Sequence, residues 1–421
     1  MKIAYLIEEW PSKNETAILN QITEVINQGH YVKAFFSFNT DQLNSEELPP
    51  EIISYGLTSN IYILKRPPLN KFNNKVIRKL YVLVNAVFPV IRTFFYSPKV
   101  LFKALFKTEY GEHKKAFKIV FAIQNLLYKN LEFDIIHSQY TPLGVWIEIF
   151  KDLGLLKGKT VTSFRGYGIN KLPKTKPADY YDFLINNCDA YTSNTNFTKK
   201  NAIKIGFPEN KISIIHTALH TEKYTYKERN ICNNTVLNIL TAASLREVKG
   251  IEYAIKAIKL ILDKNPRAKI HYKIAGSGSL KNSLQELINT NNLQKYIELI
   301  GFVNHNELKK IYEKTHLFIL PSIITKLGNQ EAQGLVLQEA QIQGIPVIGT
   351  NTGGIPEGFL NNKSGFLVEQ KNPQEIANKI LYFIRNPNKI TEFGKIGHMF
   401  VSENFNIKNE TKKLITIYKS I

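Results

Sequence analysis

The stretch that decides the fold, NQEAQGLVLQEAQIQGIPVIGTNTGGIPE, runs from residue 329 to residue 357. It places two carboxylates, Glu331 and Glu339, eight positions apart, with Gly334 between them. The apolar residues from 335 to 342 follow a helical spacing that ends at Gly344, and the following "IPVIGT" is typical of a short buried strand. The stretch therefore predicts a helix that begins near Gly334 and leads into a parallel sheet.

The start of this helix suits an anion. Its first amides lack intrahelical acceptors and carry positive potential, and a glycine there lets a phosphate approach closely. We expect a diphosphate at the amides of Gly334, Leu335 and Val336. Glu339 lies about 7 Å further along the axis, where a carboxylate accepts hydrogen bonds from ribose hydroxyls. Glu331 lies on the other side, near a donor sugar; from spacing alone, two solvated helix acids remain the alternative.

Apolar runs alternate with helical patterns along the whole chain. Strand-like runs are KIAYLI, YVKAFFSF, FDIIHSQY, KTVTSFRGYG, CDAYTSN and KISIIH, then, beyond a polar stretch at 220–238, LNILTAASL, KIHYKIAG, IELIGFV, HLFILPS and IPVIGT. Such alternation predicts parallel sheets with helices on both faces, and 421 residues suggest two domains. We expect an α/β chain of two doubly wound, Rossmann-like domains facing across a cleft that holds the site. Their predicted bounds are 1–225 and 235–404, with a C-terminal helix at 405–421 packing back on the first domain.

The positive charge is concentrated in one window. The chain has 55 Lys and Arg against 35 Asp and Glu, and residues 65–130 hold 14 basic and 2 acidic residues. Apolar clusters such as "FPVIRTFFY" and "VLFKALFK" lie in this basic insertion. The combination favours an anionic membrane surface, with solvated amphipathic helices as the alternative, and no motif supports nucleic-acid binding.

No segment is expected to span a membrane. The longest apolar run, residues 80–91, has 12 residues, whereas a span needs roughly 20. The apolar run after Met1 is too short for a signal peptide. Two cysteines, Cys188 and Cys232, predict no disulfide framework. We expect a cytoplasmic bacterial protein, peripheral on the inner face of the membrane.

The ordered set of motifs resembles the retaining glycosyltransferases of family four (glycosyl transferases group 1), which have the GT-B fold. The family pattern of Glu, seven residues and Glu, then a "G-x-P-V" strand and a "GG-x-x-E" loop, matches Glu331 to Glu339, "GIPVIGT" and "TGGIPE". "AGSGSLKNSL" resembles the family's Gly-x-Gly turn, and "LIGFV" resembles its base-reading segment. The resemblance implies that further residues bind the donor: Gly276, Phe302, Val303, Gly353 and Gly354.

The N-terminal half resembles the polysaccharide-assembly branch, typified by colanic-acid transferases. The matching segments are "EEWPSKNETAILNQ", "DIIHSQY" and "SFRGYGI". They imply a set of residues on the acceptor or sugar side: Asn14, Glu15, Thr16, Arg165 and Gly166. His137 is expected to reach the sugar, or else to be a satisfied histidine at a strand end. Three positions depart from the branch pattern: Gln139 and Arg165 replace histidines, and Gly168 replaces an aspartate.

The run "ASLREVKG" resembles the family's phosphate site. Lys249 matches, Ser244 occupies the usual arginine position, and we expect Arg246 to replace that arginine. The resemblance implies a catalytic set of Glu331, Lys249, Arg246 and His137, acting on a nucleoside-diphosphate sugar without a cofactor or a metal ion. The implied reaction moves the sugar, with retention, to a glycan or a lipid-linked acceptor in surface polysaccharide biosynthesis. A sugar-nucleotide epimerase of the same fold and a non-catalytic glycan- or partner-binding relative remain alternatives.

Overall fold

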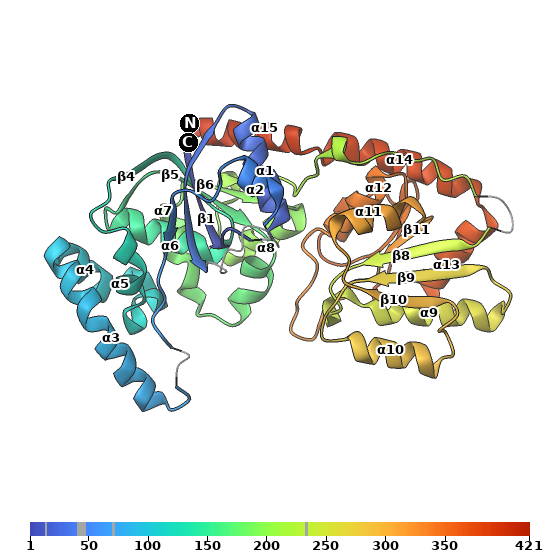
Figure 1. Ribbon diagram of the computed structural model, residues 1–421, viewed down its shortest axis with the longest axis horizontal. Helices are drawn as coiled ribbons and strands as arrows, with labels where there is room; N and C mark the ends of the chain where they lie inside the picture. Colours follow the sequence, from blue (N-terminus) through green and yellow to red (C-terminus); the bar gives the residue numbers. More distant parts are fainter. Residues whose placement is uncertain (13–14, 40–47, 70–71, 232–234) are drawn as a thin grey trace. The chain divides into compact units, whose positions relative to one another are not determined.

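The computed structural model describes residues 1–12, 15–39, 48–69, 72–231 and 235–421, in two compact units (Figure 1). Unit 1 comprises Met1–Ser193, Lys199–Ile215 and Thr411–Ile421, and unit 2 comprises Asn194–Thr198 and His216–Glu410. Each unit therefore includes a short segment that is separate in sequence from its main part. Residues 194–198 and 216–225, which the predicted bounds assign to the first domain, belong to unit 2.

Unit 1 is built on a seven-stranded sheet in which every neighbouring pair is parallel. The order is β3-β2-β1-β4-β5-β6-β7. The strands are β1 (Lys2–Glu9), β2 (Tyr31–Asn39), β3 (Ile61–Ile63), β4 (Leu131–Ser138), β5 (Leu156–Phe164), β6 (Ala190–Ser193) and β7 (Ile212–Ile214). In β1, Ala4 and Leu6 face one buried core while Ile3 and Tyr5 face another. Such burial on both faces is why the central strands are almost continuously apolar.

Helices supply the two cores of unit 1. They are α1 (Thr16–Asn27), α2 (Pro50–Ser54), α3 (Lys75–Tyr96), α4 (Pro98–Phe106), α5 (Lys118–Ala122), α6 (Thr141–Asp152), α7 (Asp182–Asn187), α8 (Asn196–Ile205) and the end of α15 (Ile407–Ser420). α4 to α7 cover one face of the sheet, and α1, α2 and the end of α15 cover the other. Short 3₁₀ or π segments join them: η2 (Thr108–Phe117), η3 (Ile123–Asn125), η4 (Tyr167–Lys171), η5 (Leu172–Lys174), η6 (Ala178–Tyr181) and η7 (Glu209–Lys211).

Unit 2 repeats the plan with a six-stranded parallel sheet in the order β10-β9-β8-β11-β12-β13. Its strands are β8 (Leu237–Ala242), β9 (Ile270–Ala275), β10 (Ile297–Gly301), β11 (Leu317–Leu320), β12 (Val347–Thr350) and β13 (Gly365–Val368). Its helices are α9 (Ile251–Lys264), α10 (Lys281–Thr290), α11 (His305–Glu313), α12 (Leu335–Ile342), α13 (Pro373–Arg385) and α14 (Asn388–Asn404), with short turns η8 (Thr221–Lys223), η9 (Glu247–Lys249) and η10 (Ile355–Gly358).

The predicted α/β class with two doubly wound sheets is confirmed. In unit 1 the strand order reverses between β1 and β4, and in unit 2 it reverses between β8 and β11. At such switch points the connections leave in opposite directions, which opens a crevice beyond the carboxyl ends of the strands. β3 and β13 were not predicted, because their three- and four-residue apolar runs are too short to show a period.

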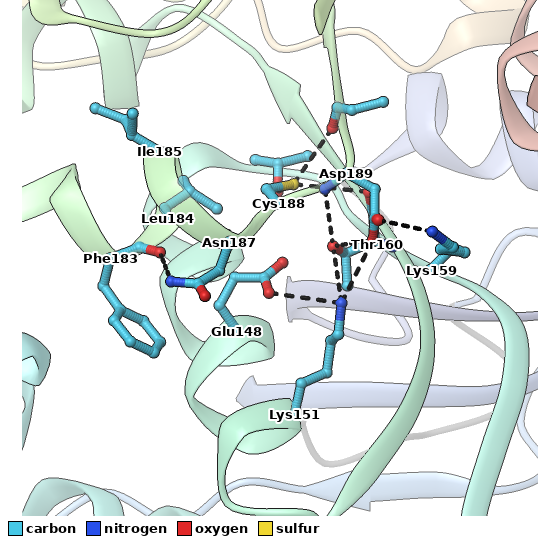
Figure 2. Close-up of polar contacts among 12 residues, drawn as sticks. Glu148, Lys151, Lys159, Thr160, Phe183, Leu184, Ile185, Asn187, Cys188 and Asp189 are labelled. Atoms are coloured by element: carbon cyan, nitrogen blue, oxygen red, sulfur yellow. Dashed lines mark hydrogen bonds and ion pairs between the residues drawn. The ribbon is translucent and has the colours of Figure 1, made fainter. Parts of the chain in front are cut away.

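A partly buried ionic cluster fastens α6 to the sheet of unit 1 (Figure 2). Asp189 Oδ2 accepts from the Thr160 amide at 2.8 Å and lies 3.4 Å from Lys151 Nζ. Burial raises the pKa of the neighbouring Cys188 thiol to about 12, so this cysteine stays protonated and unreactive. Cys188 is thus the buried thiol expected from the sequence, and Cys232 lies outside the described residues.

α3 differs from its prediction. The helix has 22 residues, whereas the sequence suggested an apolar run of 12. By length and composition alone it could cross a membrane, with a mean hydropathy of 1.2 over 18 residues, of which 22% are buried within the protein. The prediction that no segment is long enough to span a membrane is therefore wrong, because α3 has the necessary length. The helix extends across Lys79 and Arg92, at which the apolar run was judged to end.

Candidate functional site

In unit 2, Lys249 and Glu331 meet at the switch point. Lys249 ends η9 in the loop after β8, and Glu331 lies in the loop after β11. Lys249 Nζ forms an ion pair with Glu331 Oε2, and the two side chains are only 16% and 17% exposed. Gly250 allows this approach: its φ is +58°, and a Cβ there would overlap the carbonyl oxygen of Pro321. The two catalytic candidates are thus brought together from separate loops.

Arg246 lies on the same loop, before Lys249. Its Nε donates to Ser244 Oγ at 3.0 Å, so the guanidinium folds back over the position where relatives carry an arginine. That Arg246 substitutes for the arginine of the family pattern stays a prediction. Its exposed head remains available to an anion.

Glu339 lies in α12 in surroundings that disfavour its charge. Burial raises the pKa of this carboxyl to about 7, although the Tyr312 hydroxyl and the Lys309 charge act in the opposite direction. Tyr312, fully buried, donates to Glu339 Oε2 at 3.4 Å. A carboxyl held in this way gains from ligand hydroxyls that donate to its ionised form. Tyr312 and Lys309 were missed because they lie on α11, about thirty residues earlier, and carry no local motif.

The start of α12 has the predicted form. Gly334 is its N-cap with φ +81°, and Leu335 and Val336 open its first turn, where an α-helix leaves amides without intrahelical acceptors. Glu331 precedes this turn and Glu339 follows it on the same helix. The geometry is thus that of an anion site flanked by two carboxylates.

The two glycines of the "TGGIPE" loop have a packing role that the sequence did not predict. We expected their bare backbone to make room for the sugar nucleotide. A Cβ at Gly353 would instead overlap the carbonyl oxygen of Glu331, and one at Gly354 that of Ala332. The Gly354 amide also donates to Glu331 O at 3.1 Å. The glycines therefore hold the segment that carries Glu331, and their contact with the sugar nucleotide stays a prediction.

The Gly-x-Gly turn packs in a similar manner. Gly276 has φ +146°, a Cβ there would overlap the carbonyl oxygen of Ala243, and its amide donates to Gly301 O at 2.7 Å. Phe302 and Val303 follow Gly301 directly, at the end of β10, and the Phe302 side chain is 77% exposed. An exposed aromatic ring at the carboxyl edge of the sheet is available to stack on a base.

Unit 1 carries its own polar group at its switch point. Arg165, after β5, donates from Nη2 to Gln139 Oε1 at 2.7 Å, and Gln139 donates to Gln21 Oε1 at 3.1 Å. Arg165 Nε is buried without a hydrogen-bond partner among the described residues. Tyr140 donates to Glu15 at 2.9 Å. Gln21 and Tyr140 were missed although both end quoted segments, "EEWPSKNETAILNQ" and "DIIHSQY", because the resemblance assigned no role to those positions.

His137 does not have the accessibility that the prediction requires. It is fully buried, its Nδ1 lies 2.6 Å from Tyr418 Oη, and its Nε2 lies 2.8 Å from Ser163 Oγ. Burial, aided by the charge of Arg165, lowers its pKa to about 3, so the ring is neutral. The structure contradicts a catalytic contact of His137 with the sugar and supports the alternative of a satisfied histidine at a strand end.

The remaining candidates are placed as follows. Thr16 is exposed at the start of α1, Gly166 has φ +73° in the turn after β5, and Asn14 lies outside the described residues. Gly168 is explained by space: a Cβ there would lie 2.8 Å from Pro142 Cδ, so the aspartate of the branch pattern has no room. Across the described ranges, no group of three or more His, Cys, Asp and Glu side chains is suited to a metal ion.

Comparison with known proteins gives matches over most of the chain. The family described as "Glycosyltransferase Family 4" matches residues 93–223, and "Glycosyl transferases group 1" matches residues 223–399. WcaL of Salmonella typhimurium, assigned as a colanic acid biosynthesis glycosyltransferase, is 28% identical over 391 residues, 91% of each chain. The amylovoran biosynthesis glycosyltransferase AmsK of Erwinia amylovora is 26% identical over 383 residues, 90% of this chain and 89% of that protein.

Solved structures agree on the fold. Anabaena HepE, crystallised with UDP and glucose, matches with a TM-score of 0.68 at 14% identity over the whole of both chains. Staphylococcus aureus TarM matches with a TM-score of 0.68 at 14% identity over 99% of this chain and 98% of that one. Together with the two doubly wound sheets, these matches define a glycosyltransferase of the GT-B fold. Over residues 93–399 the chain is similar to glycosyltransferases of family four, and the relatives it matches include proteins of the polysaccharide-assembly branch that the N-terminal motifs indicated.

Proposed function

We propose that this glycosyltransferase moves a sugar from a nucleoside-diphosphate sugar to a glycan or lipid-linked acceptor, with retention of anomeric configuration, in surface polysaccharide biosynthesis. The observation that carries the proposal is the grouping of Lys249, Glu331 and Glu339 around the start of α12. HepE, of similar fold, was crystallised with UDP and glucose, and the relatives WcaL and AmsK are assigned to colanic acid and amylovoran biosynthesis.

The donor is held by unit 2. Its diphosphate lies at the amides of Gly334, Leu335 and Val336, its ribose hydroxyls donate to Glu339, and its base stacks near Phe302. Ionised Glu339 gains hydrogen bonds that compensate for its burial, which ties nucleotide binding to loss of a proton. The charge that grows on the leaving diphosphate is opposed by Lys249 and Arg246.

When the donor binds, the Lys249–Glu331 ion pair is exchanged for contacts of both residues with the donor. The diphosphate competes for Lys249, and the carboxylate of Glu331 is then free to accept from donor-sugar hydroxyls. Because no carboxylate is required as nucleophile, we propose same-face transfer in which the departing phosphate helps to deprotonate the acceptor hydroxyl. Arg165, which replaces a histidine, faces the acceptor side in unit 1.

The test is incubation of the protein with uridine, guanosine and adenosine diphosphate sugars, with and without a lipid-linked glycan acceptor. Acceptor-dependent release of the nucleoside diphosphate, with the donor's anomeric configuration in the product, is the expected result. Interconversion of the donor without acceptor indicates an epimerase, and binding without turnover indicates a non-catalytic relative. The matches to transferases favour neither alternative. We place the reaction in the cytoplasm, at the inner face of the membrane.

A further inference from the structure

Helix α3 presents a continuous apolar face to the outside of unit 1. The exposed large side chains of this face are Val76, Ile77, Leu80, Leu83, Val84, Val87, Phe88, Ile91, Phe94 and Phe95. At 3.6 residues per turn they fall within a sector of roughly 140° that runs the full length of the helix. Phe102 and Phe106 extend the exposed apolar surface onto α4. Among the described residues of unit 1, nothing covers this apolar surface.

The opposite side of α3 is already occupied. Val82, Ala86, Pro89 and Thr93 are buried, and Val82 and Ala86 pack against Phe121 of α5. Gln124 adds a hydrogen bond from Nε2 to the Pro89 carbonyl at 3.3 Å. The helix is therefore fastened to the domain along one side while its other side is free. A helix fixed in this way is suited to lie along a surface, since crossing a bilayer would detach it from α5.

The charges around this face have one sign. Residues 52–108 contain no Asp or Glu. Lys79 and Arg92 flank the apolar sector of α3, one on either edge, and Lys99 is exposed at the start of α4. Lys103 and Lys107 differ from these, because both form ion pairs with Asp152 at 3.3 and 2.9 Å. They belong to the packing of α4 on α6 and are poor sites for testing a surface contact.

We infer that α3 and α4 form an in-plane membrane anchor that binds the surface of an anionic bilayer. The apolar sector enters the boundary between headgroups and acyl chains, and the basic residues beside it contact anionic headgroups. Charge complementarity selects this occupant over a second copy of the chain, which would bring two acid-free basic faces together. Residues 75–92 precede the matched family segment, which begins at residue 93, so the family match does not account for most of α3.

The anchor rests on the proposed function, because a lipid-linked acceptor lies in the same membrane. The inference adds to the proposed function by naming the helices, α3 and α4, and the apolar face that contact the membrane. Because α3 and α4 carry none of the candidate donor or acceptor residues, membrane binding and sugar transfer are separable by experiment.

The test is flotation of the full chain with vesicles of phosphatidylcholine alone or with one-third phosphatidylglycerol. We expect binding to the anionic vesicles at low salt, and loss of binding as salt screens the charges. The triple variant Phe88→Asn, Phe95→Asn, Phe102→Asn removes exposed side chains and should weaken binding at least tenfold. Its matched control, Tyr31→Asn, Ile53→Asn, Met399→Asn, changes exposed apolar residues elsewhere and should bind as the wild type does.

A charge-reversal pair isolates the electrostatic part. Lys79→Glu, Arg92→Glu, Lys99→Glu should abolish the preference for anionic vesicles, whereas Lys33→Glu, Lys264→Glu, Lys412→Glu, with the same change in net charge, should retain it. Transfer to a water-soluble acceptor should be unchanged in every variant, which separates failure of the anchor from failure of the proposed function.

Three outcomes overturn the inference. The first is no binding of the wild type to anionic vesicles at low salt. The second is a lipid-free dimer that the Phe→Asn variant dissociates, because a second copy would then cover the face. The third is resistance to extraction at alkaline pH, because α3 would then span the bilayer.

Discussion

Two glutamates eight positions apart, Glu331 and Glu339, have opposite electrostatic surroundings. Glu331 is neutralised by Lys249, whereas Glu339 is half-buried beside the Tyr312 hydroxyl, with a pKa raised to about 7. Glu331 is held in an ion pair with Lys249. Glu339 loses its proton when a ligand supplies hydrogen-bond donors to its carboxylate. The difference supports the proposed roles, with Glu331 at the diphosphate–sugar junction and Glu339 at the ribose.

We expect Glu339→Gln to weaken donor binding and to remove its dependence on pH. In the wild type, nucleotide affinity should rise about tenfold between about pH 6 and about pH 8, because the ionised form of a group with a pKa of about 7 becomes the main species. Calorimetric titration with the nucleoside diphosphate at several pH values measures this. The same slope in wild type and variant would show that Glu339 does not bind the ribose.

The same substitution should stabilise the unliganded protein at alkaline pH. A carboxyl whose pKa is raised in the folded state contributes stability that is complete below about pH 4.5 and lost as the pH rises through about 7. Glutamine does not titrate, so this cost is absent from the variant. We expect its free energy of unfolding to exceed that of the wild type by at least about 1 kcal/mol near pH 8 and to equal it near pH 4, because one pKa unit corresponds to about 1.4 kcal/mol. Thermal unfolding of both proteins across this range decides it.

We expect Lys249→Ala to lower kcat about a hundredfold or more, since the lysine opposes charge that grows in the transition state. Glu331→Gln serves as the companion variant, because it weakens the same ion pair but keeps the cation. If both variants lose activity equally through misfolding, their melting temperatures will fall together. Turnover of Lys249→Ala within about twofold of the wild type would place the diphosphate elsewhere.

At the scale of elements, loops after neighbouring strands support one another through backbone contacts. The loop after β12 packs through Gly353 and Gly354 on the segment that follows β11 and carries Glu331. The turn after β9 packs through Gly276 on the segment after β8. Glycine is required at these positions because a side chain would meet a carbonyl oxygen of the next loop.

We expect Gly353→Ala to reduce both activity and thermal stability. Its φ of +59° disfavours alanine by about 1 kcal/mol, and the overlap with Glu331 O adds to this cost. Gly56→Ala is the matched control, because Gly56 has φ +63° but no atom within 4 Å of the added Cβ. Gly56→Ala should lose only the stability that the positive φ costs, and it should keep full turnover. Equal losses in the two variants would rule out the packing role.

At the scale of the molecule, both ends of the chain belong to unit 1 (Figure 1). β1 lies inside the sheet between β2 and β4, and the end of α15 packs Leu414 and Tyr418 into the core beside Tyr5 and His137. The last eleven residues are therefore part of a core formed by the first strands.

We expect removal of residues 411–421 to destabilise unit 1 by at least about 3 kcal/mol, because two large buried side chains are lost and His137 Nδ1 loses its partner. Urea unfolding followed by tryptophan fluorescence reports this unit alone, since Trp10 and Trp146, the two tryptophans of the chain, both lie in it. Tyr418→Phe, which keeps the ring, should lose only about 1–3 kcal/mol. An unchanged transition after truncation would contradict the role of α15.

The sequence by itself determined the parallel α/β class, the start of α12 at Gly334 and the succession of motifs. These signals are local, because helix periodicity, a cap or an apolar strand involves residues within one or two turns. Only the tertiary structure decided which side chains far apart in the sequence contact one another. Lys249 meets Glu331 from 82 residues away, and His137 meets Tyr418 from 281 residues away. It also decided that His137 is buried and that one side of α3 is free, since burial depends on which segments pack on a residue and no local pattern records that.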